Sequence, residues 1–591
     1  MNTDIFKNLN KTQKEAVSYM EGPSVILAGA GSGKTRVLVH KVQNLIVNGK
    51  VDPSSIVMIT FTNKAASEMK SRIERLCRLE TPLGFIGTFH AFCARFLRIH
   101  GDLLGFSRKF VIYDSGDQIA LLKKIVKDHG DSKFSPSYYL YRISLAKNEL
   151  IPPSKYLDVF SDYQAQSVYK IYDAYQKELK KNDAMDFDDL LGRTIELFMF
   201  QPQILEKYQN RYRQILVDEF QDTNTVQYVI TKKLGEKHKN VTIVGDFSQS
   251  IYAFRGADIA NLEKFQKDFP KSKVFNLETN YRSTQTILDF AYKIISKNKT
   301  HPILQLLAKN APGDEIVFFE GGTEQDEAIY VTEEIERMKD RYPYTAFAVL
   351  YRTNAQSRII EEAFLHMGTP YVLIGGTRFY ERKEIKDILA YLKLIVNPKD
   401  QVARDRGLKL GKRRFEGFAK LFQEIKDSYE DYSTEALMEK VFEATGYLDL
   451  YHPDDPEDAT RIENIKELKS VAISFPKIVE FLEQIALVES EYFEKEKKGA
   501  KDGVKLMTLH QAKGLEFDVV FIVGVEEGIL PHSRSSDDHF QIEEERRLFY
   551  VGITRARKKL YITHARRRFI FGRRGESLKS RFLFENEEYL S

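Results

Sequence analysis

Short apolar runs recur along the chain, separated by stretches whose apolar residues have helical spacing. In the first half the runs cover residues 24–27, 56–61, 215–217 and 241–244. In the second half they cover residues 316–319, 347–350, 371–374, 504–507, 519–522 and 560–563. Runs of this length are typical of buried strands, and helices between them indicate parallel pairing. The pattern therefore predicts an α/β fold, with a parallel sheet in the second half.

The pattern changes between about residues 109 and 183, where helices rich in lysine and tyrosine carry no glycine-loop chemistry. We interpret this stretch as an all-helical insertion. Residues 186–190, which hold three aspartates, resume the first domain. A catalytic acid cluster is one interpretation of them, but an acidic cap at a helix N-terminus is favoured.

Length and composition favour a multi-domain globular protein. At 591 residues the chain should hold three or four structural units. Its 42% hydrophobic and 29% charged residues argue against long disordered tracts. The longest apolar runs are too short to span a membrane, and the first residues lack the features of a signal peptide. Two cysteines, Cys77 and Cys93, cannot build a disulfide framework or a zinc cage, so we expect a reducing cytoplasm.

The net charge of +4 is small for this length, but its distribution is uneven. Residues 546–581 hold 13 lysines and arginines and one acidic residue, Glu576. Such a run can attract phosphate groups. A solvated basic face is the alternative interpretation.

The strongest candidate for chemistry is a glycine-rich loop between the first apolar run and a helical stretch. Its residues are Ala28, Gly29, Ala30, Gly31, Ser32, Gly33, Lys34 and Thr35. Glycines let backbone N–H groups point inward, Lys34 supplies an ammonium group, and Thr35 supplies a hydroxyl for Mg²⁺. Ala28 stands where the strict G-x-x-x-x-G-K-[ST] pattern has glycine. Because strand, Gly-Lys-Thr and helix are in register, the loop predicts triphosphate binding rather than an ordinary turn.

Two carboxylates end the apolar run 215–217. Asp218 can hold Mg²⁺ together with Thr35, and Glu219 can orient and deprotonate an attacking water. Apolar runs that end in Asp-Glu are common by chance, so half of the evidence for these roles of Asp218 and Glu219 comes from the glycine loop upstream. The next run leads to Gln249, a candidate sensor of the phosphate state beside aromatic residues.

In order and spacing, these motifs resemble the UvrD/Rep family of superfamily 1 DNA helicases over nearly the whole chain. The matching segments are AGAGSGKT (28–35), FTNKAA (61–66), GTFH (87–90), VDEFQDTN (217–224), VGDFSQSIYAFRGA (244–257), LETNYRS (277–283), GGTRFYERKEIKD (375–387), MTLHQAKGLEFDVVF (507–521) and VGITRAR (551–557). The family tolerates alanine at the first loop position, which accounts for Ala28.

The resemblance implies two RecA-like P-loop motor domains with parallel sheets, each carrying a mainly helical insertion. The first motor domain would comprise residues 1–108 and 184–278, with the insertion 109–183. The second would comprise residues 279–376 and 501–591, with a shortened insertion, 377–500. Residues 401–420 of that insertion are basic and depart from the family pattern, so its duplex-contacting role is not carried over.

The resemblance also implies a role for individual residues. Beyond the glycine loop, the implied nucleotide contacts are Gln13 (adenine edge), Arg36 (nucleotide pocket), Gln249 (γ-phosphate sensor), Tyr281 (stacking on adenine), Glu516 (ribose), and Arg282 and Arg555 (arginine fingers). The implied DNA contacts are the aromatic platforms Phe61, Tyr252 and Phe254, and the backbone or base contacts Thr88, His90, Arg255, Arg352, His510 and His532.

The resemblance implies an ATP- and Mg²⁺-dependent DNA helicase that, like the family's 3′-to-5′ members, moves 3′-to-5′ on single-stranded DNA and unwinds duplex ahead of it, in repair or replication. Its partners would be single-stranded DNA, single-strand/duplex junctions and repair or replication proteins, without a membrane, and it would be a monomer or self-associate weakly. A non-catalytic nucleic-acid clamp is an alternative, against which the intact Lys34, Asp218 and Glu219 argue. A helicase-nuclease fusion is another, but no leftover segment is long enough for a nuclease domain.

Overall fold

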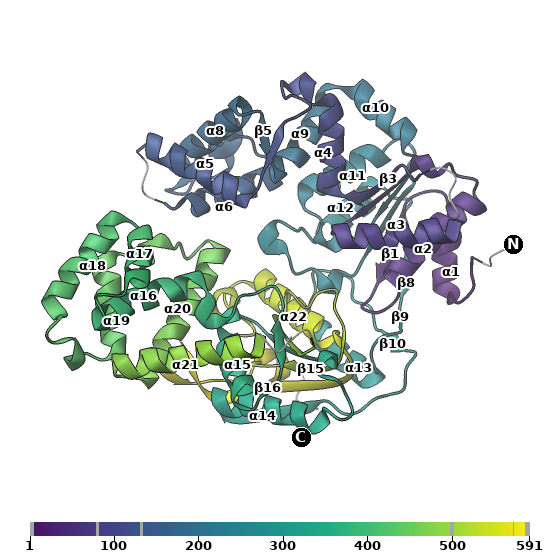
Figure 1. The fold of residues 1–591 in the computed structure, drawn as a ribbon. Helices are drawn as coiled ribbons and strands as arrows, with labels where there is room; N and C mark the ends of the chain where they lie inside the picture. Colours follow the sequence, from purple (N-terminus) through teal and green to yellow (C-terminus); the bar gives the residue numbers. More distant parts are fainter. Residues whose placement is uncertain (1–4, 78–81, 131–133, 497–501, 571–572, 585–591) are drawn as a thin grey trace. The chain divides into compact units, whose positions relative to one another are not determined.

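The computed structural model describes residues 5–77, 82–130, 134–496, 502–570 and 573–584. The chain forms two compact units, each drawn in Figure 1. The first contains Met1–Arg282 and Asn298–Asn310, and the second contains Ser283–Lys297 and Ala311–Ser591. No helix among the described residues is long and apolar enough to cross a membrane.

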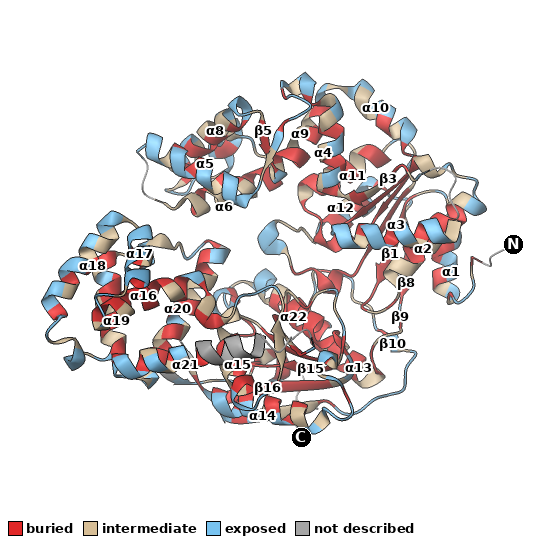
Figure 2. Ribbon diagram, in the orientation of Figure 1, coloured by how far each residue is buried: buried red, intermediate tan, exposed pale blue. Residues whose placement is uncertain are grey.

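The first unit is built on a six-stranded parallel sheet in the order β3-β2-β6-β7-β1-β8. Its strands are β1 (Ser24–Ala28), β2 (Ile56–Thr60), β3 (Phe85–Thr88), β6 (Gln214–Val217), β7 (Val241–Gly245) and β8 (Lys273–Leu277). The four inner strands are those that the apolar runs predict, and they are buried along their whole length (Figure 2). The edge strands β3 and β8 were not predicted.

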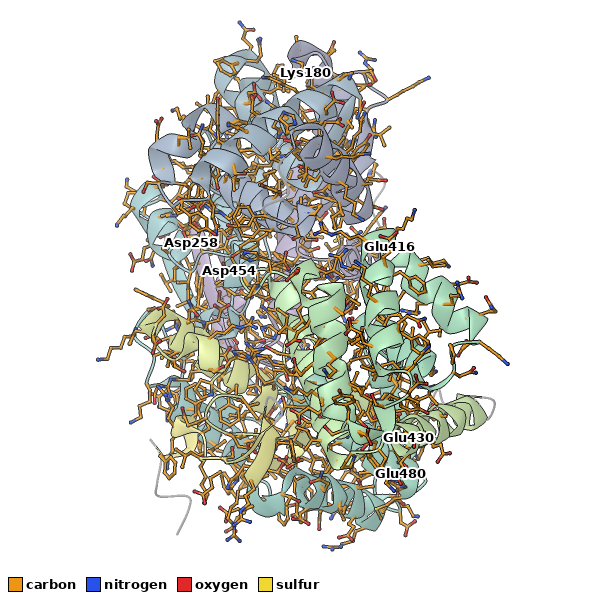
Figure 3. All side chains as sticks on the ribbon, turned by 90° about the vertical axis from the view of Figure 1, so that its left-hand side faces the viewer. Lys180, Asp258, Glu416, Glu430, Asp454 and Glu480 are labelled. Carbon is orange, nitrogen blue, oxygen red and sulfur yellow. The ribbon has the colours of Figure 1, made fainter. Side chains whose placement is uncertain are left out.

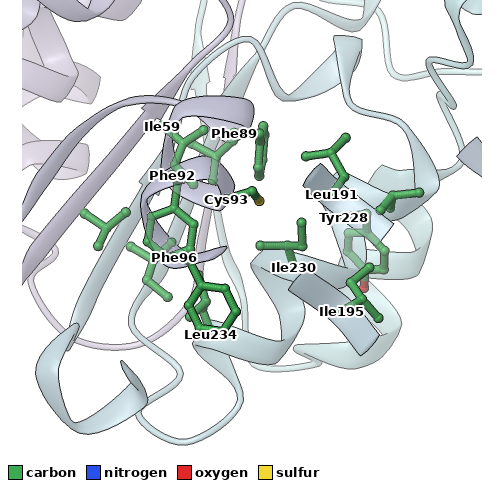
Figure 4. Close-up of a cluster of buried hydrophobic side chains, with 14 of the residues drawn as sticks. Ile59, Phe89, Phe92, Cys93, Phe96, Leu191, Ile195, Tyr228, Ile230 and Leu234 are labelled. Atoms are coloured by element: carbon green, nitrogen blue, oxygen red, sulfur yellow. The ribbon is translucent and has the colours of Figure 1, made fainter. Parts of the chain in front are cut away.

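Helices cover both faces of this sheet. They are α1 (Lys11–Ser18), α2 (Lys34–Val47), α3 (Asn63–Cys77), α4 (Phe89–His100), α9 (Phe187–Phe200), α10 (Pro202–Arg211), α11 (Thr225–Gly235) and α12 (Asn261–Asp268). Because both faces are covered, the inner strands carry apolar residues at successive positions instead of alternating. Figure 4 shows part of one core, where side chains of α4 meet those of α9 and α11: Phe89, Phe92, Cys93, Phe96, Leu191, Ile195, Tyr228, Ile230 and Leu234.

A helical subdomain interrupts the first unit between β4 (Val111–Tyr113) and β5 (Ala184–Asp186), which pair in parallel and hold its two ends together. Its helices are α5 (Ser115–Asp128), α6 (Pro136–Asn148), α7 (Tyr156–Val159) and α8 (Ala165–Lys181). The tyrosines that mark this stretch in the sequence build much of its core, including Tyr138, Tyr139, Tyr156, Tyr172 and Tyr175. Asp186 caps α9, accepting a hydrogen bond from the Asp189 N–H at 2.8 Å, which confirms the acidic-cap interpretation.

The second unit contains a parallel sheet in the order β11-β16-β15-β12-β14-β13. Its strands are β11 (Val317–Thr323), β12 (Phe347–Tyr351), β13 (Tyr371–Leu373), β14 (Val504–Thr508), β15 (Phe517–Ile522) and β16 (Ala556–Ile570), and β17 (Arg573–Glu576) pairs antiparallel with β16. The six predicted apolar runs all form strands of this sheet. The fold class is therefore confirmed as α/β with parallel sheets.

Helices of the second unit belong to two groups. Those outside the connection between β13 and β14 are α13 (Gln285–Ile295), α14 (Glu324–Met338), α15 (Ser357–His366), α22 (His539–Ile553) and α23 (Arg581–Phe584). Those between β13 and β14 are α16 (Lys383–Val396), α17 (Gln401–Lys409), α18 (Lys412–Ile425), α19 (Thr434–Thr445), α20 (Pro456–Ser474) and α21 (Ile478–Glu496). The second group has its own apolar core.

The division between the units differs from the predicted boundary at 278/279. β9 (Thr279–Asn280) pairs with β10 (Leu307–Ala308), and both belong to the first unit. The Asn280 amide donates to the Ala30 carbonyl at 2.6 Å, and the Tyr281 N–H donates to the Gly31 carbonyl at 3.0 Å. Residues 279–282 are therefore anchored to the glycine loop and continue the first unit.

Several charges of the basic run 546–581 have acidic partners within the second unit. Some of these partners come from distant parts of the chain. Arg568 is buried against Glu327 and Glu526, and Arg581 pairs with Glu527 at 2.8 Å. Exposed charges also occur elsewhere on the surface, as Figure 3 shows for Lys180, Glu416, Glu430, Asp454 and Glu480.

Candidate functional site

The glycine loop leaves β1 and enters α2 without a side-chain cap. Gly31 and Gly33 have φ of +66° and +86°, a left-handed conformation that strains any other residue. The hydroxyl oxygen of Ser32 is buried and has no hydrogen-bond partner among the described residues. An uncapped helix start beside a curled loop leaves N–H donors for an anion, so the geometry fits phosphate binding.

Residues 280–282 lie directly against this loop. A Cβ added at Gly31 would meet the Cβ of Arg282 at 2.7 Å and the Asn280 amide nitrogen at 2.8 Å. The Tyr281 hydroxyl accepts a hydrogen bond from the Asn10 amide at 3.1 Å. The structure thus brings the predicted adenine-stacking and arginine-finger residues of this segment to the loop.

Gln13 lies beneath the loop and is 0% exposed. Its amide nitrogen donates to the Ser32 carbonyl at 2.9 Å, and its amide oxygen accepts from the Asn10 N–H at 3.1 Å. In this conformation Gln13 therefore ties α1 to the glycine loop and does not present its amide to a base. Arg36 lies half-buried in the first turn of α2.

Lys34 and Glu219 form an ion pair of 3.0 Å. Burial alone would lower the pKa of Lys34, but the charges of Glu219, Asp246 and Asp218 outweigh it and raise this pKa. Lys34 therefore stays protonated, as a phosphate ligand requires. Glu219 has a left-handed backbone with φ of +49°, which is costly for a residue with a side chain. In this backbone conformation the Glu219 carboxylate lies 3.0 Å from the Lys34 ammonium group.

Asp218 is 7% exposed, and burial together with the charge of Glu219 raises its pKa to about 7. Its Oδ1 is buried without a hydrogen-bond partner among the described residues. A divalent cation would both satisfy this oxygen and favour the ionised carboxylate. No group of three His, Cys, Asp or Glu side chains suited to a metal occurs in the described part of the chain. Mg²⁺ fits here with Asp218, the Thr35 hydroxyl and phosphate oxygens as ligands.

Two buried residues that the sequence did not single out connect the loops after β6 and β7. Gln221 donates to Glu219 at 2.6 Å, and its amide oxygen accepts from the Asp246 N–H at 3.1 Å. Asp246 in turn accepts a hydrogen bond from the Gln249 amide at 2.5 Å. The position of a polar residue inside the buried turn 217–224 is the sequence feature from which Gln221 could have been identified. The predicted sensor Gln249 is thus linked to the carboxylates through Asp246 and Gln221.

Aromatic side chains gather at the end of β2 and in the loop after β7. Phe61 and Tyr252 are parallel within 4°, with ring centres 6.1 Å apart, and Phe254 lies 6.0 Å from Tyr252. The Arg255 guanidinium lies 5.8 Å from the ring centre of Tyr252 and 5.5 Å from that of Phe254. Phe254 is 44% exposed. We call these four residues the aromatic cluster, and their geometry suits stacking of bases beside a phosphate.

Thr88 and His90 lie at the start of α4. The Thr88 hydroxyl caps the helix, accepting from the Ala91 N–H at 3.2 Å. His90 meets Phe187 edge to face at 5.7 Å, and burial lowers the pKa of His90. Phe187 is 45% exposed and was not predicted as a site residue. Its position as an aromatic residue within the acidic stretch 186–190 is the sequence feature from which Phe187 could have been identified.

The remaining predicted residues belong to the second unit. Arg352 binds Glu545 through both carboxylate oxygens, with a shortest distance of 2.6 Å, and the His532 N–H donates to the same carboxylate at 3.0 Å. His510 is half-buried after β14. Arg352 and His532 are thus brought together by an acid that the sequence did not single out.

Arg555 and Glu516 also have partners within the second unit. Arg555 is 1% exposed, and its guanidinium donates to the carbonyls of Val551 and Leu515 at 2.9 and 3.1 Å. Glu516 is exposed and forms an ion pair with Arg557. In this conformation the guanidinium of Arg555 is occupied by main-chain oxygens.

A parallel sheet with a Gly-Lys-Thr loop after one strand and a lysine-bound carboxylate after another defines a P-loop nucleotide-binding protein. The family profile described as UvrD/REP helicase N-terminal domain matches residues 9–270, and the UvrD-like helicase C-terminal domain profile matches residues 275–435 and 411–567. The chain belongs to the UvrD/Rep helicase family.

Relatives with assigned names are similar over almost the whole chain. A protein of Staphylococcus epidermidis named ATP-dependent DNA helicase PcrA is 41% identical over 640 aligned positions, which cover 99% of this chain and 87% of the relative. Proteins of Staphylococcus aureus with the same name are 40% identical over the same shares of both chains.

Proposed function

We propose that this chain is an ATP-driven DNA helicase that moves 3′-to-5′ along single-stranded DNA and unwinds duplex ahead of it. The loop after β7 carries this proposal, because it joins the two candidate sites of the first unit. Asp246 and Gln249 stand at its nucleotide end, and Tyr252 and Phe254 belong to the aromatic cluster a few residues later. A change in phosphate state at one end is therefore within reach of the surface that would hold DNA. Family membership supports the activity and the direction.

The proposed nucleotide chemistry follows from charge and geometry. Lys34 and the loop N–H groups would hold the phosphates, while Thr35 and Asp218 would hold Mg²⁺. Glu219, strained toward the loop, would orient the attacking water and accept its proton. Bound ATP supplies the phosphoryl group whose transfer to water drives the motor. The arginine-finger roles of Arg282 and Arg555 stay predictions; Arg555 must exchange its main-chain partners before it can bind a phosphate.

The proposed DNA binding does not depend on base sequence. Stacking on an aromatic ring contributes about 1–3 kcal/mol per base and accepts any base. The aromatic cluster would supply the platforms in the first unit, and Arg352, His510 and His532 would contact the strand from the second. We also propose single-strand/duplex junctions and repair or replication proteins as partners, a monomer or weak self-association, and a reducing cytoplasmic location.

Strand displacement on 3′-tailed, 5′-tailed and blunt duplexes of one sequence tests the function. We expect ATP-dependent displacement of the 3′-tailed duplex only. Preference for the 5′ tail would contradict the direction, and DNA-stimulated ATPase without displacement would reduce the function to translocation. Lys34→Ala is the matched control and should abolish hydrolysis. Hydrolysis by Lys34→Ala at the parent rate would contradict the site assignment.

A further inference from the structure

Glu545 lies at the junction of two candidate DNA contacts in the second unit. It belongs to α22 and is 5% exposed. Arg352, which follows β12, donates from Nε to both of its oxygens at 3.1 and 2.9 Å and from Nη2 at 2.6 Å. The His532 N–H adds a fourth hydrogen bond at 3.0 Å. One carboxylate therefore fixes both a guanidinium and the start of the turn that carries His532.

The bonds to Glu545 use one edge of the Arg352 guanidinium. Only Nε and Nη2 take part, and Nη1 is left outside the pair. The Arg352 side chain is 20% exposed although its partner is almost completely buried. Thr353 and Gln356, next to Arg352, line a surface pocket together with Glu463 and His532. The second edge of a guanidinium held in this way can donate hydrogen bonds to a phosphate oxygen.

The imidazole of His532 is held from another side. Its Nε2 lies 3.1 Å from Glu463 of α20, and Arg534 lies 3.5 Å from the same carboxylate. Glu545 holds the backbone of His532 while Glu463 holds its ring, so both the position and the rotation of this side chain are determined.

We infer that Glu545 is a positioning residue for DNA binding: it presents the outer edge of Arg352 and the turn of His532 together to one stretch of the DNA backbone. This inference rests on the proposed function. Displacement of Glu545 by a phosphate is the competing possibility, but it would leave a buried carboxylate without its cation, which is strongly unfavourable. Glu545 and Arg352 therefore stay paired when DNA binds.

Single-stranded DNA affinity of Glu545→Gln, Arg352→Gln and the double variant tests this inference, measured by fluorescence anisotropy with oligo-dT across a salt series. We expect each single variant to weaken binding about tenfold and to reduce the slope of log affinity against log salt by about 0.7, the loss of one phosphate contact on a single strand. The double variant should bind no worse than Arg352→Gln, because Glu545 acts through Arg352.

Several outcomes would overturn the inference. Tighter binding by Glu545→Gln would show that the acid competes with DNA, and parent-like binding would show that it positions nothing. Additive losses in the double variant would indicate a general structural role. If Glu545→Gln fails to fold, the double variant, which leaves no uncompensated buried charge, must still fold and bind like Arg352→Gln.

The controls separate this inference from the proposed function. Glu457→Gln removes one carboxylate from the same unit, from an ion pair with Arg461 in which Glu457 is 81% exposed, and should bind DNA like the parent. A parent protein without DNA-stimulated ATPase would overturn the proposed function and this inference with it. Normal stimulation in the parent combined with parent-like Glu545→Gln would overturn the inference alone.

Discussion

Lys147 anchors the helical subdomain of the first unit, and its replacement by methionine tests that anchor. Its ammonium group, at the end of α6, lies 2.6 Å from Asp186 and 3.0 Å from Asp189, and the three side chains are 6%, 2% and 7% exposed. The Tyr175 hydroxyl also donates to Asp186, at 3.0 Å. Burial would lower the pKa of Lys147, but the charges of Asp186 and Asp189 outweigh it and raise this pKa. The lysine is therefore charged and balances two buried carboxylates.

Lys147→Met keeps an unbranched stem of similar length but leaves the carboxylates without their cation. Removing one partner of a buried pair costs about 3–5 kcal/mol, which corresponds to about a hundredfold or more in an opening equilibrium. Protonation can relieve part of this cost, because burial and the charge of Asp186 already raise the pKa of Asp189 to about 6. The loss should therefore be larger at pH 8 than at pH 5.

Native-state hydrogen exchange of the amides in α6 and α9 measures this opening, with intrinsic exchange rates corrected for pH. Lys177→Met is the matched control, since Lys177 pairs with Asp173 at the same 2.6 Å but is 75% exposed. We expect no measurable change for the control and a loss of protection confined to the subdomain and α9 for Lys147→Met. Equal effects of the two variants, or an equal loss at both pH values, would refute the reasoning.

Three further predictions concern the glycine loop, the aromatic cluster and pH. Gly33→Ala should weaken ATP binding measured by calorimetry, because a side chain at φ of +86° costs about 1–3 kcal/mol. The control is Gly192→Ala, where an added Cβ meets nothing within 4 Å, and this variant should bind ATP like the parent. Phe254→Ala should weaken oligo-dT binding by about 1–3 kcal/mol, and Phe254→Trp should keep the affinity of the parent. The control Phe200→Ala, at a 71% exposed phenylalanine outside the aromatic cluster, should not change the affinity. Parent-like binding by Phe254→Ala would contradict the stacking role. Burial and the charge of Asp186 raise the pKa of Asp188 to about 7. The folded state therefore binds more protons than the unfolded state between about pH 4 and 7. Protection of the α9 amides from hydrogen exchange should fall as pH rises through that range. Asp188→Asn should reduce this dependence, while Asp189, whose pKa is raised to about 6, keeps the remainder, and an unchanged pH profile in that variant would rule out Asp188 as a source.

Much of the fold follows from local sequence, and the failures have physical causes. Inner strands of a covered parallel sheet must be apolar on both faces, so their runs are unmistakable. Strand β8 alternates exposed and buried residues, and β3 is four residues long and includes Gly87, so neither edge strand forms such a run. The ion pairs of the basic run 546–581 could not be predicted, since acidic partners such as Glu327 lie far away in sequence.

In the candidate site, too, some residues could be predicted from the sequence and others could not. Lys34, Asp218 and Glu219 stand in motifs whose chemistry can be inferred from residue type and spacing, and the structure joins Lys34 to Glu219. Gln221 and Glu545 were missed because their importance comes from the partners that the fold brings to them. The domain boundaries and the roles assigned to individual site residues stay predictions.

Coupling between hydrolysis and DNA binding can begin within the first unit. β6 and β7 are adjacent in register, so the loops that follow them leave the sheet side by side. Gln221 contacts both loops, through Glu219 on one side and the Asp246 N–H on the other. Loss of a phosphate from Lys34 would change the partners of Glu219, and Gln221 would transmit that change to the loop that ends in the aromatic cluster. A Gln221→Ala variant that hydrolyses ATP at the parent rate but no longer responds to single-stranded DNA would identify this amide as the link, whereas full DNA stimulation in that variant would contradict it.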